Sequence, residues 1–340
     1  MKTEGGQSES GSTLQPELRE RLQAALGDAY TIERELPRGG MSRVFAAKEN
    51  ALGRMVVIKV LAPELAATLS VERFKREIML AARLQHPHIV PLLSAGEAGG
   101  SLYYTMPLVD GESLRDKMSR ERQMNIADVS RILEEVASAL AYAHDEGVVH
   151  RDMKPENVLF FHGQAVVLDF GIAKALSAAV SGDDQSGRIT QRGMSLGTPT
   201  YIAPEQAAGD PDLDHRADIY ALGVVTYEML SGHPPFAGRS PQQVMAAHAT
   251  QKPESIGARR RDTPGELAAI VMKCLEKKPS DRPSSAMEIA RLMMVTPMGG
   301  TRVVIPGSGS VRLPAWLPWA IAGVATLVSI GLGLKVAGVF

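Results

Sequence analysis

The hydrophobic and polar positions of the chain separate a part with strand periodicity from a later part with helix periodicity. Short runs rich in Val, Ile and Tyr and punctuated by Gly or Pro predict strands, at residues 30–36, 42–49, 54–61, 88–97 and 101–109. Longer amphipathic runs predict helices, around residues 126–145, 217–230, 265–275 and 286–294. Strands followed by helices favour an α+β fold in two lobes, with a small antiparallel sheet in the first and mainly helices in the second.

One helix is expected within the strand-rich part. Val71, Phe74, Ile78 and Ala81 repeat at helical spacing among charged residues. The resulting division of the chain is a disordered start at 1–15, a short helix at 16–29, an N-terminal lobe at 30–109 and a C-terminal lobe at 110–294.

The end of the chain predicts a membrane helix. Residues 315–334 carry no charge, and about 20 such residues match a hydrocarbon core of ~30 Å. We expect a juxtamembrane linker at 295–313 and a transmembrane helix at 314–337, followed by a very short tail. A buried core helix is the alternative interpretation. Positive charges before this segment favour a single-pass protein of the cytoplasmic membrane, with the large part in the cytoplasm.

Composition narrows the partners and the compartment. Lys and Arg number 37 against 38 Asp and Glu, a formal net charge of -1, so no overall basic field favours nucleic acid as a partner. The lone cysteine, Cys274, has no internal disulfide partner and is expected to be a small core residue in a reducing compartment.

Two motifs in the middle of the chain carry the chemistry. The string HRDMKPEN occupies residues 150–157 and is followed by Asp169-Phe170-Gly171. Such a match arises by chance in roughly one chain of this length in ten thousand. From about Tyr30 to Met294 the sequence resembles the eukaryotic-like protein kinases, which include the bacterial Hanks-type serine/threonine kinases. The resemblance implies the bilobal kinase fold.

The resemblance also implies roles for these residues. Asp152 would accept the proton of the substrate hydroxyl, and Lys154 would place a positive charge near the transferred phosphate. Asn157 and Asp169 would hold Mg²⁺, which prefers hard oxygen ligands. The implied cofactors are therefore ATP and Mg²⁺, with Mn²⁺ as a substitute for the metal.

A lysine and a glutamate upstream complete the implied catalytic set. Lys59 ends a strand-like run at the place where the family carries the lysine that contacts the α- and β-phosphates. Glu77 lies near the apolar face of the expected helix and would form an ion pair with Lys59. A plain surface carboxylate is the alternative for Glu77.

The implied nucleotide site has one departure from the family pattern. Its phosphate-covering loop is Pro37, Arg38, Gly39, Gly40, Met41 and Ser42, with Pro37 and Ser42 where the family usually has glycine. The adenine would be covered by Val44 and held between Val57 and Leu159. Its hydrogen bonds would go to the Pro107 carbonyl and the Val109 N–H, with Met106 as gatekeeper.

The polar, Gly- and Ser-rich segment between Gly171 and Gly197 resembles the activation loop of the family. Thr190 and Ser195 are candidate phosphorylation sites, because Arg151 would bind a phosphate there. Thr198, together with Lys154, resembles the serine/threonine branch of the family. Further structural positions implied by the resemblance are Glu205 with its partner Arg282, and Asp218, which would bond the backbone of the catalytic loop.

The function expected from this resemblance is that of a membrane-tethered serine/threonine protein kinase that phosphorylates its own activation loop. Its partners would be protein substrates, a second copy acting in trans as a dimer, and the lipid bilayer. A pseudokinase scaffold that binds nucleotide without turnover is the alternative, supported by Pro37 and Ser42. A kinase of small molecules is disfavoured by the long activation segment.

Overall fold

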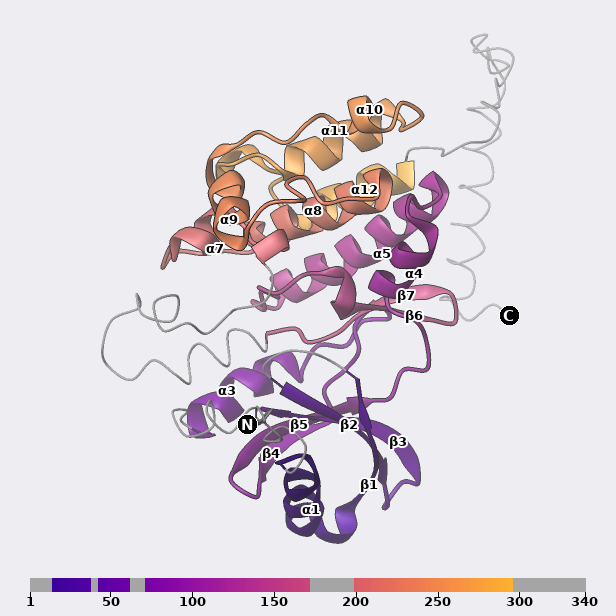
Figure 1. Ribbon diagram of the computed structural model, residues 1–340, viewed down its shortest axis with the longest axis vertical. Helices are drawn as coiled ribbons and strands as arrows, with labels where there is room; N and C mark the ends of the chain where they lie inside the picture. Colours follow the sequence, from indigo (N-terminus) through magenta and orange to yellow (C-terminus); the bar gives the residue numbers. More distant parts are fainter. Residues whose placement is uncertain (1–13, 38–41, 62–70, 172–198, 296–340) are drawn as a thin grey trace, which may run out of the picture. The chain divides into compact units, whose positions relative to one another are not determined.

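The computed structural model describes residues 14–37, 42–61, 71–171 and 199–295. Within these ranges a sheet precedes a set of helices, and the bilobal α+β arrangement expected from the sequence is confirmed (Figure 1). Both lobes belong to one compact unit, Met1–Met298. The predicted transmembrane segment at 314–337 lies outside the described residues.

The N-terminal lobe is built on a five-stranded antiparallel sheet with the order β1-β2-β3-β5-β4. Its strands are β1 (Tyr30–Leu36), β2 (Ser42–Glu49), β3 (Arg54–Leu61), β4 (Ser94–Ala98) and β5 (Ser101–Pro107). Side chains alternate between two faces, as strand geometry requires. Phe45 therefore belongs to one apolar cluster, and its neighbour Val44 belongs to another.

A helix packs on each face of this sheet (Figure 1). On one face, α1 (Leu14–Leu26) buries Leu22 and Leu26 against residues of β1 to β3; the short helix η1 (Gly27–Ala29) then leads into β1. On the other face, α3 (Val71–Ala81) buries Phe74 and Ile78. The second cluster also takes in residues of the C-terminal lobe, so it joins the lobes.

The predicted strand at 88–97 is wrong in its first part. Only Ser94–Ala98 pairs within the sheet. Pro91 lacks a backbone donor, which disfavours a central strand position. The segment before it pairs instead with the other lobe: the Val90 N–H donates to the Val167 carbonyl at 3.0 Å, and the Val167 N–H donates to the His88 carbonyl at 2.9 Å.

The C-terminal lobe is organised around one fully buried helix. Every residue of α8 (Arg216–Ser231) from Ala217 to Leu230 is buried. Most of them are apolar, as a helix covered on all sides requires, and the exceptions Asp218, Thr226 and Glu228 have hydrogen-bond partners. It packs against α5 (Ile126–Asp145) and α11 (Gly265–Cys274), and α5 also packs against α12 (Ala286–Val295). Cys274 is buried, in line with its prediction as a core residue. The remaining helices are α4 (Leu114–Glu121), α7 (Pro204–Ala208), α9 (Pro241–Thr250), α10 (Ile256–Arg259), η2 (Pro155–Asn157), η3 (Pro199–Tyr201) and η4 (Pro279–Asp281).

Four of the observed α-helices, α4, α7, α9 and α10, are not predicted by the hydrophobic periodicity, and two of them, α4 and α9, begin with a capping box. Ser113 caps α4, with Asp116 returning the hydrogen bond. Ser240 caps α9, and the side chain of Gln243 accepts a hydrogen bond from the Ser240 N–H in return. Both helices are short, at 8 and 10 residues, so the cap is a stronger sequence signal for them than the periodicity.

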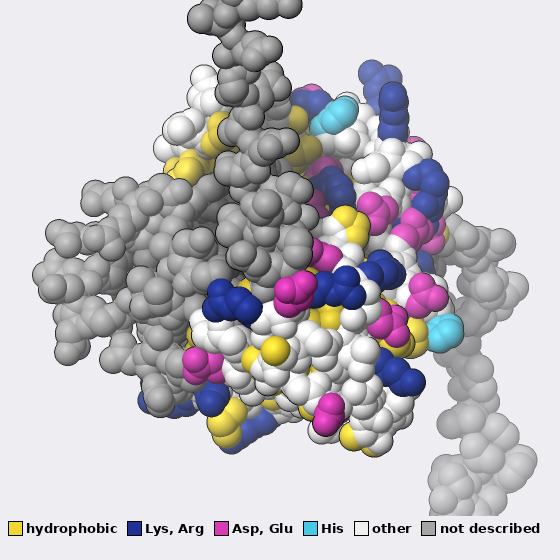
Figure 2. Space-filling view, turned by 60° about the horizontal axis from the view of Figure 1, so that its bottom comes forward, with side chains coloured by type: hydrophobic (Ala, Val, Ile, Leu, Met, Phe, Trp, Pro, Cys, Tyr) yellow, Lys and Arg dark blue, Asp and Glu magenta, His cyan; other side chains and the backbone are white. Residues whose placement is uncertain are grey.

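Charges of both signs share the surface. On the face in Figure 2, Lys and Arg side chains lie interspersed with Asp and Glu over the described residues. Among the helices of the ranges given above, none combines the length and apolar character that a membrane crossing requires.

Candidate active site

A hairpin brings together the residues assigned to the metal. Strands β6 (Val158–Phe161) and β7 (Gln164–Val167) pair antiparallel, with Val158 opposite Val167. Just beyond this pair, the Leu168 N–H donates to the Asn157 carbonyl at 2.9 Å. Asn157, just before β6, and Asp169, just after β7, therefore lie near each other at the open end of the hairpin.

Asp152 lies at the centre of the polar cluster. Lys154 Nζ donates to Asp152 Oδ2 at 2.6 Å, and the Asn157 amide donates to the Asp152 carbonyl at 2.8 Å. The Asp152 side chain is 51% exposed. Its carboxylate can therefore contact a hydroxyl group that arrives from solvent, while its backbone carbonyl is fixed by the Asn157 amide.

His150 connects this loop to the segment that carries Asp169. Its Nδ1 accepts from the Asp152 N–H at 3.2 Å, so Nε2 carries the proton and donates to the Leu168 carbonyl at 2.8 Å. The ring also meets Phe170 edge-on, at 4.9 Å between centroids. His150 is completely buried, and it fixes the spacing between the two halves of the polar cluster.

The buried carboxylate of Asp218 anchors the catalytic loop. It accepts from the backbone N–H groups of His150 and Arg151, both at 2.8 Å, and from His144 Nε2 at 2.8 Å. Complete burial disfavours its charged form, but His144, His150 and the Arg151 N–H together outweigh burial and hold the pKa of Asp218 below its ordinary value. The implied role of Asp218 thus has a geometric basis, and His144 joins it as a residue that the sequence analysis missed.

Lys59 reaches the cluster from the sheet. Its Nζ donates to Asp169 Oδ2 at 2.6 Å, and both side chains are largely buried. The hydroxyl of Tyr104 donates to the other carboxylate oxygen at 2.9 Å. Glu77 lies on α3, but its side chain is outside the described part of the structure, so the ion pair with Lys59 stays a prediction.

The residues assigned to the adenine gather in the cluster that joins the lobes. Val44, Val57 and Met106 are buried there, and Leu159 and Val109 pack against them. Pro107 is the last residue of β5 and pairs with Val56 of β3. Pro37 and Ser42 flank the covering loop, whose other positions, Arg38, Gly39, Gly40 and Met41, are not among the described residues.

Glu205 and Arg282 form a buried bidentate ion pair. The two guanidinium nitrogens of Arg282 donate to the two carboxylate oxygens at 2.6 and 2.7 Å. Arg282 also donates to the carbonyls of Arg216, Glu276 and Lys277, and its side chain is 0% exposed. Such full satisfaction is what a buried charge requires. The preceding candidates Thr190, Ser195 and Thr198 lie outside the described residues.

A second charged network beside the catalytic loop was missed. Arg115 on α4 donates to Glu156 at 2.8 Å and to Glu228 at 2.8 Å, and it also contacts the Tyr201 hydroxyl. Tyr201 in turn donates to Glu228 at 2.5 Å. Burial alone would lower the pKa of Arg115, but the bond to Glu228 and the other nearby partners raise it above its ordinary value. Sequence spacing gave no signal for this network, because its members come from four separate elements.

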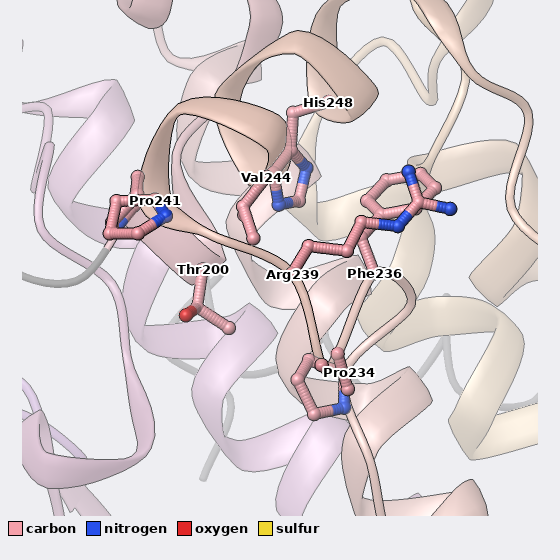
Figure 3. A pocket seen from close by; sticks show the side chains of 10 residues that line it. Thr200, Pro234, Phe236, Arg239, Pro241, Val244 and His248 are labelled. Carbon is pink, nitrogen blue, oxygen red and sulfur yellow. The ribbon is translucent and has the colours of Figure 1, made fainter.

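A pocket lies beside Pro199 and Thr200, the first two residues of the last described range. Its volume is about 240 Å³, and its lining includes Thr200, Pro234, Phe236, Pro241, Val244 and His248 (Figure 3). His248 at its inner wall bonds the Tyr220 hydroxyl at 2.8 Å, and it also hydrogen-bonds the backbone of Thr200. The imidazole therefore ties the start of this region to α8 and α9.

The buried imidazole of His248 makes stability depend on pH. Burial, with the nearby charge of Lys277, lowers the pKa of His248 from 6.5 to about 4. Between these values the unfolded state takes up a proton and the folded state does not, so stability is complete above pH 6.5 and falls towards pH 4. At 1.36 kcal/mol for each pKa unit the loss is roughly 3 kcal/mol. We expect the free energy of unfolding, measured with urea, to fall by this amount between pH 7 and pH 4. His248→Gln should flatten this dependence on pH. His233→Gln, at an exposed histidine, serves as the control; an unchanged slope in His248→Gln would contradict the assignment.

The polar cluster has the donors that a magnesium ion requires. Asp169 offers a carboxylate, and Asn157 offers an amide whose nitrogen is already engaged with Asp152, which leaves the oxygen to face a cation. Lys59, Lys154 and this pair of oxygen donors surround one region. The residues fit Mg²⁺ bound together with a polyphosphate.

Comparison with known proteins agrees with this geometry. Residues 30–293 match the family model described as protein kinase domain. The chain is 38% identical over 280 residues to the serine/threonine-protein kinase pkn3 of Myxococcus xanthus, covering 80% of this chain and 50% of that protein. It is 40% identical over 270 residues to the serine/threonine-protein kinase PknB of Mycobacterium tuberculosis, covering 78% and 42%. The identity to pkn2 of Myxococcus xanthus is 38% over 306 residues, covering 85% and 36%. The chain therefore spans half or less of the length of these relatives.

Proposed function

The chain belongs to the protein kinase family, and on this premise we propose that it transfers the γ-phosphoryl group of ATP to serine and threonine hydroxyls of proteins. The observation that best supports this proposal is that two polar groups meet. Lys59 is bonded to Asp169, and Asp152 is bonded to Lys154 and Asn157. A phosphoryl group in transfer spreads negative charge over its oxygens, so catalysis needs cations and alignment more than covalent chemistry.

In this mechanism Asp152 orients the attacking hydroxyl. The hydroxyl oxygen forms a bond to the γ-phosphorus as the bond to ADP breaks, and its proton passes to the Asp152 carboxylate. Lys154, at 2.6 Å from that carboxylate, supplies positive charge beside the transferred group. Lys59 binds the nucleotide phosphates and keeps Asp169 in place.

Asn157 and Asp169 are the residues that would hold Mg²⁺. When bound, the metal neutralises charge on the phosphate oxygens. The polar contacts of the two residues with Asp152 and Lys59 set their orientation before the metal arrives.

The proposal extends to activation by phosphorylation of the chain's own loop, in trans between two copies. Arg151 supports it: its Nε atom is buried and has no hydrogen-bond partner among the residues that the structure describes. A phosphate on Thr190 or Ser195 would add roughly -1.5 to -2 charges and satisfy this group.

Membrane tethering is a separate part of the proposal. It rests on the uncharged run at 315–334. In fractionated cells the intact chain should sediment with membranes and resist carbonate extraction. The double variant Val324→Arg, Leu327→Arg should move to the soluble fraction, because each charge at the bilayer centre costs about 3 kcal/mol. A soluble intact chain would contradict tethering.

The kinase proposal is tested with the intact chain, ATP and Mg²⁺. We expect phosphate on Ser and Thr residues between Ser177 and Thr200, and on a generic basic protein, by mass spectrometry. Adding EDTA should abolish both. A chain that binds ATP but labels neither itself nor the added protein would be the nucleotide-binding scaffold instead.

A further inference from the structure

A tyrosine hydroxyl lies against the carboxylate assigned to the metal. Tyr104 on β5 is 0% exposed, and its hydroxyl donates to Asp169 Oδ1 at 2.9 Å. Lys59 Nζ donates to Oδ2 of the same carboxylate at 2.6 Å. Each oxygen of Asp169 is thus held by a different donor, and both donors come from the sheet.

The register of the sheet makes this arrangement a built one. Lys59 on β3 and Tyr104 on β5 are directly opposite each other in the antiparallel pair. Opposite residues project from the same face, and Lys59 Nζ lies 5.7 Å from the centre of the Tyr104 ring. The two side chains run alongside each other to one target, so a change in one alters the surroundings of the other.

Two donors constrain a carboxylate more than one donor does. A single bond from Lys59 leaves the carboxylate plane able to turn about the bond that joins it to the side chain. A second bond to the other oxygen fixes that plane, and the phenol ring is itself fixed within the apolar cluster that joins the lobes.

We propose that Tyr104 is a positioning residue that holds the Asp169 carboxylate in the orientation that receives the divalent cation accompanying the nucleotide. This inference rests on the proposed function, because it concerns the same nucleotide and metal. It assigns the hydroxyl a role in metal affinity, whereas the ring contributes apolar packing.

The test compares nucleotide affinity with and without metal. Calorimetry would measure binding of adenylyl imidodiphosphate to the intact chain, once in Mg²⁺ and once in EDTA. Tyr104→Phe removes the hydroxyl and keeps the ring. We expect it to reduce the Mg²⁺-dependent gain in affinity about tenfold, since a hydrogen bond to a charged group has this magnitude. Its affinity in EDTA should stay within about twofold of the wild type.

Tyr103→Phe is the matched control. Tyr103 precedes Tyr104 on β5 and packs against the cluster on the opposite face of the sheet, so its variant should keep the full Mg²⁺ gain. In the background of Asp169→Asn, which removes the metal ligand, Tyr104→Phe should have no further effect. A thermal melt would confirm that both single variants fold.

Two results would overturn the inference. One is an unchanged Mg²⁺ gain in Tyr104→Phe. The other is an equal loss in Mg²⁺ and in EDTA, which indicates a packing role; Tyr104→Leu, which removes the ring as well, gives the reference for such a loss. If the wild-type chain shows no Mg²⁺-dependent binding at all, the proposed function itself fails, and this outcome is distinct from both.

Discussion

Replacing Asp152 by asparagine should reduce phosphorylation of the activation segment and of added protein by about a thousandfold. Positioned proton acceptors contribute roughly 10²- to 10⁴-fold to such reactions, and the amide keeps the shape of Asp152 without its basicity. Nucleotide affinity should remain within about twofold, because Asp152 meets the hydroxyl substrate and not the nucleotide. Initial rates with radiolabelled ATP, together with calorimetric nucleotide binding, would measure the two effects.

Two further variants make this result specific. Lys59→Met should abolish labelling and also weaken nucleotide binding, because Lys59 lies on the phosphate side of the site. Asp145→Asn changes an exposed aspartate at the end of α5 and should leave both measurements unchanged. Turnover of Asp152→Asn within about tenfold of the wild type would remove Asp152 from the mechanism.

Arg115→Ala should destabilise the domain by about 2 to 3 kcal/mol. Glu228 is only 8% exposed, and the substitution leaves it facing Glu156 and the Tyr201 hydroxyl without the guanidinium that joins them. Removing one partner of a fully buried pair costs roughly 3 to 5 kcal/mol. We take a lower value because Arg115 keeps part of its surface in water. The melting temperature should fall by roughly 5 to 10 °C.

The matched control is on the same helix. Arg120→Ala removes a guanidinium that pairs with Glu112 at the surface, and the melting temperature should not change measurably. Equal melting temperatures for the two variants would show that the Arg115 network does not support the fold. Activity should also fall in Arg115→Ala, since Glu156 belongs to the catalytic loop and Tyr201 to the segment after the activation loop.

Much of the sheet and of the reacting cluster could be predicted from the sequence, for two different reasons. Strands β1, β2 and β3 have the alternation and punctuation that local geometry imposes, and the predicted ranges equal the observed ones. Asp152, Asn157 and Asp169 lie close together along the chain, in motifs whose spacing is short enough to be informative.

The parts that were missed depend on contacts between distant elements. Tyr104 looks like any aromatic strand residue until the register places it opposite Lys59. Arg115 and Glu228 are far apart in the sequence and meet only because α4 and α8 are packed in the same lobe. The segment before β4 was predicted as a strand for the same reason. Its backbone pairs with Val167 in the other lobe and not with a strand of the sheet, and the local sequence does not reveal this partner.

Two residues of the catalytic centre have unusual backbone angles. Arg151 and Asp169 have φ values of 67° and 64°, a left-handed conformation that costs a residue with a side chain on the order of 1 kcal/mol or more. Asp218 and the β6–β7 hairpin hold these angles through bonds that only the complete domain supplies. A short peptide that carries the HRDMKPEN motif would therefore relax to ordinary angles and lose the constellation, so the smallest unit that can inherit this chemistry is the whole domain.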